Sequence, residues 1–120
     1  MQTVKILNLT KSFGKIRAVD SLSLDIEKGK ITGLIGADGS GKTTLIRLIT
    51  GLLIPDSGEI TVLGLNPAAQ KEELSTKIGY MPQKFGLYED LSIEENLQLY
   101  ADLKKLPYEF DELLEFTKLM

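Results

Sequence analysis

The feature that most constrains this chain is a glycine-rich stretch, GADGSGKTT, at residues 36–44. Two glycines stand five positions apart, and the second, Gly41, is followed directly by Lys42 and Thr43. Glycine permits backbone conformations closed to other residues, so consecutive N–H groups can converge on one anion. At average residue usage, a chance match to this pattern is on the order of 0.5%, which makes an incidental glycine turn a poor explanation. We therefore interpret the stretch as functional.

The segments on either side of this stretch predict a strand and a helix. Residues 31–35 are mostly apolar and predict a short strand that ends at Gly36. Apolar residues then recur at helical spacing, at Leu45, Ile46, Leu48, Ile49 and Leu52. The order strand, glycine loop, helix is the context of a phosphate-binding loop, and the N-terminal end of a helix favours an anion. The sequence therefore predicts binding of nucleotide phosphates, with ATP as the expected nucleotide.

The side chains of the loop have separate expected roles. Lys42 would reach the β- and γ-phosphates as a compact positive charge. The Thr43 hydroxyl would take one position on Mg²⁺, which prefers oxygen ligands. The predicted contacts to ATP from this loop are Gly36, Asp38, Gly39, Ser40, Gly41, Lys42, Thr43 and Thr44.

The remaining sequence predicts further strands and three helices. Apolar spacing predicts strands at 4–9, 19–26, 59–63 and 77–81. Asn66 and Pro67 predict the start of a short polar helix. Ser92 and Glu95 form the pattern of a capping box, ahead of a helix with Leu97, Leu99, Tyr100 and Leu103 on its apolar side. A last helical pattern after Pro107 carries Phe110, Leu113, Leu114 and Met120.

Composition excludes several kinds of site. The chain has no cysteine and no histidine, so these residues hold no disulfide, thiolate zinc site, histidine base or Ser-His-Asp triad. The net charge is −3 without a run of Lys or Arg, which argues against a nucleic-acid partner. The apolar patch at 48–54 is too short to span a bilayer, so we expect any membrane role to come through a partner.

Three further stretches carry a resemblance to a known family. The first is residues 44–60, which include the turn Pro55-Asp56-Ser57-Gly58. The second is the segment IGYMPQ at 78–83, and the third is LSIEENL at 91–97. Together with the phosphate loop, they resemble the first half of an ABC-type ATPase, the nucleotide-binding subunit of ABC transporters. The resemblance implies an α/β fold of the P-loop NTPase class, with an antiparallel β subdomain and the start of a parallel core. It covers residues 1–120 as one N-terminal part of an ATP-binding domain.

The resemblance implies roles for residues outside the glycine loop. Phe13 stands where the family stacks an aromatic ring on adenine; the alternative is a core or loop-packing residue. Gln83 stands where the Q-loop glutamine helps to hold Mg²⁺ and senses the membrane partner; the alternative is an exposed polar residue. Thr44 is expected to add a hydroxyl to the α- or β-phosphate. The expected metal ligands are thus Thr43 and Gln83.

At position 38 and at residues 84–90, the sequence resembles the ATPase subunits of exporters for drugs or other hydrophobic substrates. Phe85 and Tyr88 in this segment either contact a transmembrane subunit or cover the local core. The resemblance implies two partners, a transmembrane permease subunit and a second ATP-binding subunit, and a location on the cytoplasmic face of a membrane. No nucleic acid is expected.

The family's catalytic parts have no counterpart in these residues. The signature motif, the strand with the Mg²⁺-binding Asp and catalytic Glu, and the switch histidine are not here. We therefore expect ATP hydrolysis by the complete protein as a dimer, no catalytic residue within this chain, and little or no hydrolysis by it alone. The final helical pattern stops without a cap, so a fragment of a longer domain, with exposed apolar edges, is expected; the alternative is a C-terminal helix that frays.

Two other functions fit the loop. One is an ABC-type ATPase that acts on DNA or ribosomes, which the acidic charge argues against. The other is a different P-loop enzyme, such as a kinase or GTPase, which base preference in a binding assay would distinguish.

Asp38 provides the first test, because most relatives have Asn at this position. A carboxylate beside phosphates opposes anion binding unless it points outward or is hydrogen-bonded. We expect Asp38→Asn to bind ATP at least as tightly as the wild type in equilibrium titration. Weaker binding by the variant would contradict this expectation.

Overall fold

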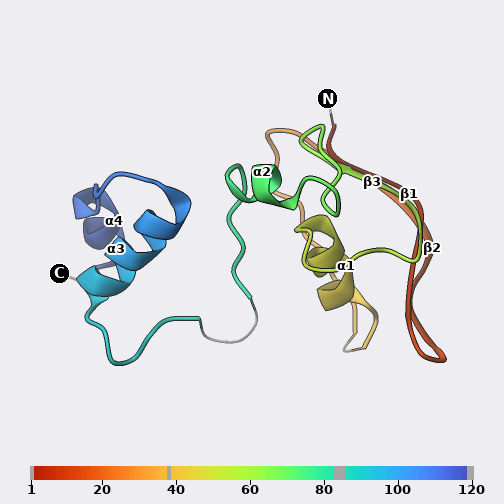
Figure 1. Cartoon of the computed structure of the whole chain (residues 1–120), viewed down its shortest axis with the longest axis horizontal. Coiled ribbons are helices and arrows are strands. Elements are labelled where there is room, and N and C mark those ends of the chain that lie inside the picture. The colour runs from red at the N-terminus through yellow and green to blue at the C-terminus, as the bar shows by residue number, and fades with distance from the viewer. Residues whose placement is uncertain (1, 38, 83–85, 119–120) are drawn as a thin grey trace. The chain divides into compact units, whose positions relative to one another are not determined.

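The computed structural model describes residues 2–37, 39–82 and 86–118. Its elements follow in the order β1 (Gln2–Phe13), β2 (Ile16–Glu27), α1 (Lys42–Ile49), β3 (Ser57–Val62), α2 (Lys71–Ser75), α3 (Ile93–Lys104) and α4 (Asp111–Thr117), as labelled in Figure 1. The contacts divide the chain into two compact units, Met1–Tyr80 and Met81–Met120. Asp38, Gln83 and Phe85 lie outside the described residues.

The first unit contains an antiparallel sheet with the strand order β2-β1-β3. A turn at Gly14, whose φ is 62°, joins β1 to β2, and Phe13 pairs with Ile16 beside it. The predicted strands at 4–9, 19–26 and 59–63 are confirmed, although β1 and β2 extend further at both ends. The predicted antiparallel β subdomain is therefore present.

A bulge in β1 explains its irregular apolar spacing. Val4 and Ile6 are buried, Leu7 and Asn8 are exposed, and Leu9 is fully buried again. Asn8 has a φ of 50°, and the register shifts between Ile6 and Leu9 in the pairing with β2. A bulge adds one residue to a strand and returns the following side chain to the original face. Leu9 consequently points into the core beside Ile6.

The core of the first unit lies between the sheet and the helices α1 and α2. Leu45 and Leu48 of α1 and Leu74 of α2 are buried together with sheet residues (Val4, Ile6, Leu9, Val19, Ile60 and Val62) and with Leu65. Burial of each such leucine side chain contributes about 1.5–3 kcal/mol. This packing fixes α1, and with it the end of the glycine loop, against the sheet.

Three predictions of secondary structure were wrong. Residues 31–35 and 77–81 are not strands, and Ile31 and Ile35 are 104% and 97% exposed. A strand is held by hydrogen bonds to its neighbours in a sheet, and neither stretch belongs to the described sheet, whose strand order is β2-β1-β3. The polar helix begins at Lys71 instead of Pro67. The Asn66 Oδ1 accepts hydrogen bonds from the N–H groups of Ala68 and Ala69, and these bonds form a turn before α2.

The second unit contains α3 and α4. The predicted capping box is confirmed: Ser92 Oγ accepts from the Glu95 N–H, and Glu95 Oε1 accepts from the Ser92 N–H, both at 3.0 Å. These bonds hold the pKa of Glu95 below its ordinary value. The expected apolar side of α3 is only partly right, because Leu103 is 66% exposed. No helix in the described ranges is long and apolar enough to cross a membrane.

Asp56 ties the turn before β3 to the end of β1. Its Oδ2 accepts from the Ser12 N–H at 2.7 Å, and Lys11 Nζ lies 3.5 Å from its Oδ1. The Asp56 N–H donates to the Thr10 carbonyl at 2.9 Å. The Ser12 bond, aided by Lys11, holds the pKa of Asp56 below its ordinary value of 3.8.

This lowered pKa predicts a dependence of stability on pH. A carboxyl whose folded pKa is depressed contributes stability above its unfolded pKa and loses it as the pH falls through the folded value. We expect Asp56→Asn to melt at a lower temperature than the wild type at neutral pH, with the difference closing as the pH falls below 3.8. Thermal melts followed by circular dichroism across this range measure it. A difference that is constant with pH would contradict the role of the carboxylate charge.

Candidate phosphate-binding site

The glycine loop turns sharply where α1 begins. Gly41 caps the helix in the left-handed conformation, with φ 95° and ψ 7°. A Cβ at this position would lie 2.2 Å from the Ala18 carbonyl oxygen of β2, a backbone atom that has no room to move aside. Gly41 therefore meets two constraints at once, a positive φ and a close approach to another strand. Only glycine satisfies both.

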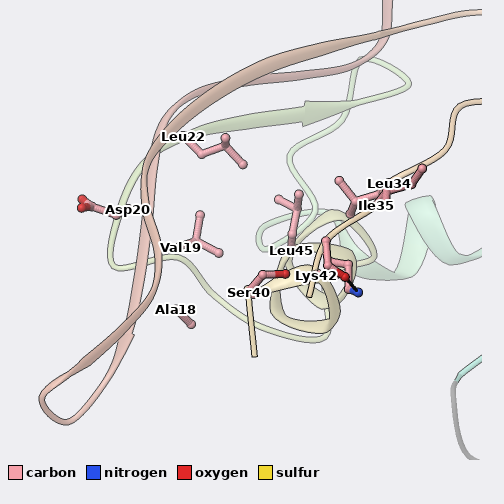
Figure 2. A pocket seen from close by; sticks show the side chains of 11 residues that line it. Ala18, Val19, Asp20, Leu22, Leu34, Ile35, Ser40, Lys42 and Leu45 are labelled. Atoms are coloured by element: carbon pink, nitrogen blue, oxygen red, sulfur yellow. Dashed lines mark hydrogen bonds between the residues drawn. The ribbon is translucent and has the colours of Figure 1, made fainter. Parts of the chain in front are cut away.

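The side chain of Lys42 folds back over the loop. Lys42 is the first residue of α1 and is partly buried, and its Nζ donates to the Gly36 carbonyl, which closes the loop on itself (Figure 2). The Ser40 N–H donates to the Ala37 carbonyl at 3.1 Å, which tightens the turn. Among the described residues, no carboxylate pairs with Lys42, and none lies in the first turn of α1.

This arrangement concentrates positive potential at one point. The unpaired N–H groups at the start of a helix carry a partial positive charge, and the Lys42 ammonium lies beside them. A carbonyl oxygen is a weaker partner for an ammonium than a phosphate oxygen, because the phosphate oxygen carries a negative charge. The loop is therefore suited to an anion with several oxygens.

A cavity of about 280 Å³ opens beside the loop (Figure 2). Its lining comes from β2, from residues 34–36, and from the loop with α1: Ala18, Val19, Asp20, Leu22, Leu34, Ile35, Gly36, Ser40, Gly41, Lys42 and Leu45. Ligand pockets for drug-sized molecules measure about 300–1,000 Å³, so this cavity is close to the lower end of that range. Asp20 contributes the one carboxylate of the lining, and Arg17 pairs with it at 3.2 Å.

The structure brings together part of the predicted set. Gly36, Ser40, Gly41 and Lys42 line the cavity, whereas Gly39, with a φ of 80°, does not. Two threonines of the first turn also lie outside the lining; Thr43 is exposed, and Thr44 is partly buried. Asp38 and Gln83 lie outside the described residues, so their expected roles stay predictions.

Phe13 lies at the end of β1 and does not line the cavity. The residue is 48% exposed and so is not part of the core, while its expected stacking on adenine stays a prediction. Lys11 Nζ lies 5.6 Å from the ring centroid, within the range of a cation–π contact. One face of the ring therefore has a charged neighbour on its own strand, and a large part of the ring is open to a ligand.

The described residues of this loop offer Mg²⁺ hydroxyl oxygens rather than carboxylates. They contain no cluster of three or more acidic or other metal-binding side chains. The exposed Thr43 hydroxyl at the start of α1 is a hard oxygen donor, and Mg²⁺ commonly takes its other ligands from water and substrate phosphates. This fits a metal that arrives with a nucleotide rather than one held by the protein alone.

Sequence reasoning missed the wall of the cavity contributed by β2. Ala18, Val19 and Leu22 line it, although the loop begins 14 residues or more after them. Contact between a strand and a distant loop has no local pattern in a sequence. The required glycine at position 41 is the one signal that some backbone passes close by.

Residues 19–120 match the ABC transporter family. The chain is 54% identical over 107 residues to the probable multidrug ABC transporter ATP-binding protein YbhF of Escherichia coli K12, which covers 85% of this chain and 18% of YbhF. It is 36% identical over 118 residues to the bacitracin transport ATP-binding protein BcrA of Bacillus licheniformis, which covers 97% of this chain and 39% of BcrA.

Solved structures show the same likeness. An ATP-binding subunit of an ABC transporter superposes with a TM-score of 0.83 at 28% identity, over 94% of this chain and 49% of that one. The dimeric ATP-binding cassette MJ0796, bound to ADP and Pi, gives a TM-score of 0.72 at 31% identity, over 84% of this chain and 47% of that one. This chain thus spans less than half the length of each of these relatives.

The contact between Gly41 and Ala18 can be tested with two alanine variants. The added Cβ in Gly39→Ala has no atom within 4 Å, so only the positive φ should lower the free energy of unfolding, by about 1–2 kcal/mol. In Gly41→Ala the added Cβ also clashes with the backbone of Ala18, so the free energy of unfolding should fall by more than about 3 kcal/mol. Urea unfolding measures both. Equal losses would show that the approach of Ala18 does not constrain the loop.

Proposed function

The chain belongs to the ABC transporter family, and we propose that it binds the triphosphate of ATP through residues 36–44. In the complete protein, this ATP would power the transport of a substrate across a membrane by a partner transmembrane subunit. One observation carries the proposal: the Lys42 ammonium, unpaired with any described carboxylate, lies over a glycine loop at the start of α1.

The chain's own groups suggest how the phosphates would be held. The Lys42 ammonium would leave the Gly36 carbonyl for the β- and γ-phosphate oxygens, while N–H groups from Gly39 to Thr43 surround them. Thr43 would supply one oxygen ligand to the Mg²⁺ that accompanies ATP, and Gln83 a second. Thr44 would donate its hydroxyl to the α- or β-phosphate. Bound Mg²⁺ would neutralise the phosphate charge that the protein alone does not balance.

Adenine would stack outside the cavity on the exposed ring of Phe13. Stacking offers contact area without hydrogen bonds to a particular base, so the site should discriminate weakly between purines. This property separates an ABC-type ATPase from a GTPase, in which guanine is selected strongly.

The complete protein would hydrolyse ATP as a dimer with a second ATP-binding subunit, on the cytoplasmic face of a membrane. The solved relative MJ0796 is a dimeric cassette bound to ADP and Pi, which supports this arrangement. Phosphoryl transfer depends on a positioned water, and residues 1–120 contain no counterpart of the family's catalytic glutamate. We expect these residues alone to bind ATP with little or no turnover.

The transported substrate follows from relatives rather than from the site. YbhF is described as a probable multidrug ATP-binding protein and BcrA as a bacitracin transport protein. Both names support transport of a drug-like compound as the process that this ATPase would serve.

Calorimetric titration with Mg²⁺ and ATP tests the proposal. Lys42→Ala should weaken ATP binding about tenfold to hundredfold, because bonds to charged groups contribute about 1.5–3 kcal/mol each. Lys30→Ala is the matched control, since it removes an exposed cation that pairs with Glu27 at 2.6 Å and does not line the cavity. GTP should bind with similar affinity to ATP. Identical binding by the two lysine variants, or a strong preference for GTP, would reject the site as proposed.

A further inference from the structure

Asp56, in the turn before β3, bonds to the end of β1 through both its carboxylate and its backbone. Its Oδ2 accepts from the Ser12 N–H at 2.7 Å, and its own N–H donates to the Thr10 carbonyl at 2.9 Å. Its Oδ1 lies 3.5 Å from Lys11 Nζ. The two segments are 44 residues apart in the sequence. One residue therefore holds three consecutive residues of β1, directly before Phe13.

The end of β1 has a neighbouring strand on one side only. In the described sheet, β1 pairs with β3 from Val4 to Thr10, whereas residues 11–13 pair with β2 alone. The pairing with β2 is irregular there, with register shifts on both sides of Lys11. A ribbon of two strands is marginally stable in water. The Asp56 carboxylate accepts the Ser12 N–H on the side where β3 has ended, so it continues the sheet in place of a strand.

Lys11 connects Asp56 to the ring of Phe13. Its Nζ lies near both groups, 3.5 Å from Asp56 Oδ1 and 5.6 Å from the centroid of the ring. The Lys11 side chain is only 17% exposed, so it is more restricted than a free surface lysine. An ion pair near the surface adds little to stability. Its consequence here is a position, because it keeps the ammonium over one face of Phe13.

Formation of the turn alone does not account for these contacts. An aspartate that serves its own turn accepts a hydrogen bond from a backbone N–H two residues further on. The described bonds of the Asp56 carboxylate go instead across the sheet, to Ser12 and Lys11. The turn also has a residue with a positive φ of its own, Gly58, at 92°. The carboxylate is therefore placed to hold β1 rather than to form its own turn.

The group formed by Asp56, Lys11 and Phe13 is separate from the phosphate cavity. None of the three residues lines that cavity. A ring with an ammonium on one face offers the other face to a planar ligand, and Phe13 is 48% exposed. Stacking on an aromatic ring is sensitive to where the ring lies, whereas phosphate binding in the loop does not depend on it.

We infer that Asp56 is a positioning residue for the ring that stacks on adenine. Through Thr10 and Ser12 it fixes the strand that carries Phe13. Through Lys11 it keeps an ammonium on one face of the ring, which leaves the opposite face for the base. Asp56 thus affects the part of ATP affinity that comes from the base and not the part that comes from the phosphates. The inference rests on the proposed function, in which adenine stacks on Phe13.

Calorimetric titration of this chain with Mg²⁺-ATP and with Mg²⁺-tripolyphosphate separates the two parts, because tripolyphosphate has no base. Phe13→Ala should weaken ATP binding about tenfold, within the range for one base stacked on an aromatic ring, and leave tripolyphosphate binding unchanged. Asp56→Ala should weaken ATP binding about threefold or more, a part of the same stacking contribution, again without effect on tripolyphosphate. A wild-type ratio of the two affinities in Asp56→Ala would overturn the inference.

Two further variants show how Asp56 acts. Asp56→Asn keeps an acceptor for the Ser12 N–H but loses the charge that attracts Lys11, so its affinity ratio should fall between those of Asp56→Ala and the wild type. If Asp56→Ala does not give a cooperative melt, the ratio in Asp56→Asn decides in its place. In the Phe13→Ala background, Asp56→Ala should have no further effect on the ratio, because the two residues act as a unit. A further loss of the same size would contradict action through the ring.

Asp25→Ala is the matched control for a general effect on the sheet. It removes an exposed carboxylate of β2, which accepts from Gln2 Nε2 at 3.2 Å, and should leave the affinity ratio unchanged. An equal change of the ratio in Asp25→Ala and Asp56→Ala would overturn the inference. A wild-type chain that binds neither ligand would reject the phosphate site itself. Normal binding of tripolyphosphate with a ratio that Asp56 does not alter would reject the role of Asp56 alone, so the two failures are distinguishable.

Discussion

The turn at Gly41 is the constraint on which the rest of the site depends. It brings the loop backbone so close to the Ala18 carbonyl of β2 that no side chain fits at position 41. Gly41 is also the N-cap residue of α1. The exposed amides of the helix start and the Lys42 ammonium thereby meet on one side of the loop. Burial of Leu45 and Leu48 against the sheet then fixes the direction in which this group of donors points.

The two units of the chain differ in net charge. Residues 1–80 contain ten basic and eight acidic residues, a net charge of +2, whereas residues 81–120 contain four basic and nine acidic residues, a net charge of −5. The unit with the phosphate loop therefore attracts an anion weakly as a whole, and the loop adds a strong local field. The second unit is acidic instead, and two of its carboxylates, Glu89 and Asp90, are exposed in the segment before α3.

Local patterns in the sequence predicted the features that depend on few residues. The glycine loop, the β1–β2 hairpin and the capping box of Ser92 and Glu95 each follow from residues close together in the chain, and the match over residues 19–120 confirms the ABC family. Features that depend on distant neighbours were missed. The apolar stretch at 31–35 looks like a strand but has no pairing strand among the described residues. Asp56 resembles any aspartate of a turn until its bond to Ser12 of β1 is seen.

The backbone amide resonances of this chain, followed during titration with ATP and Mg²⁺, test the phosphate site most directly. Phosphate binding at this loop should give saturable shifts that are largest for the N–H groups of Gly39, Ser40, Gly41, Lys42 and Thr43, where the amides would turn towards phosphate oxygens. Shifts that do not saturate, or that are spread over the surface without a maximum in this loop, would contradict this site.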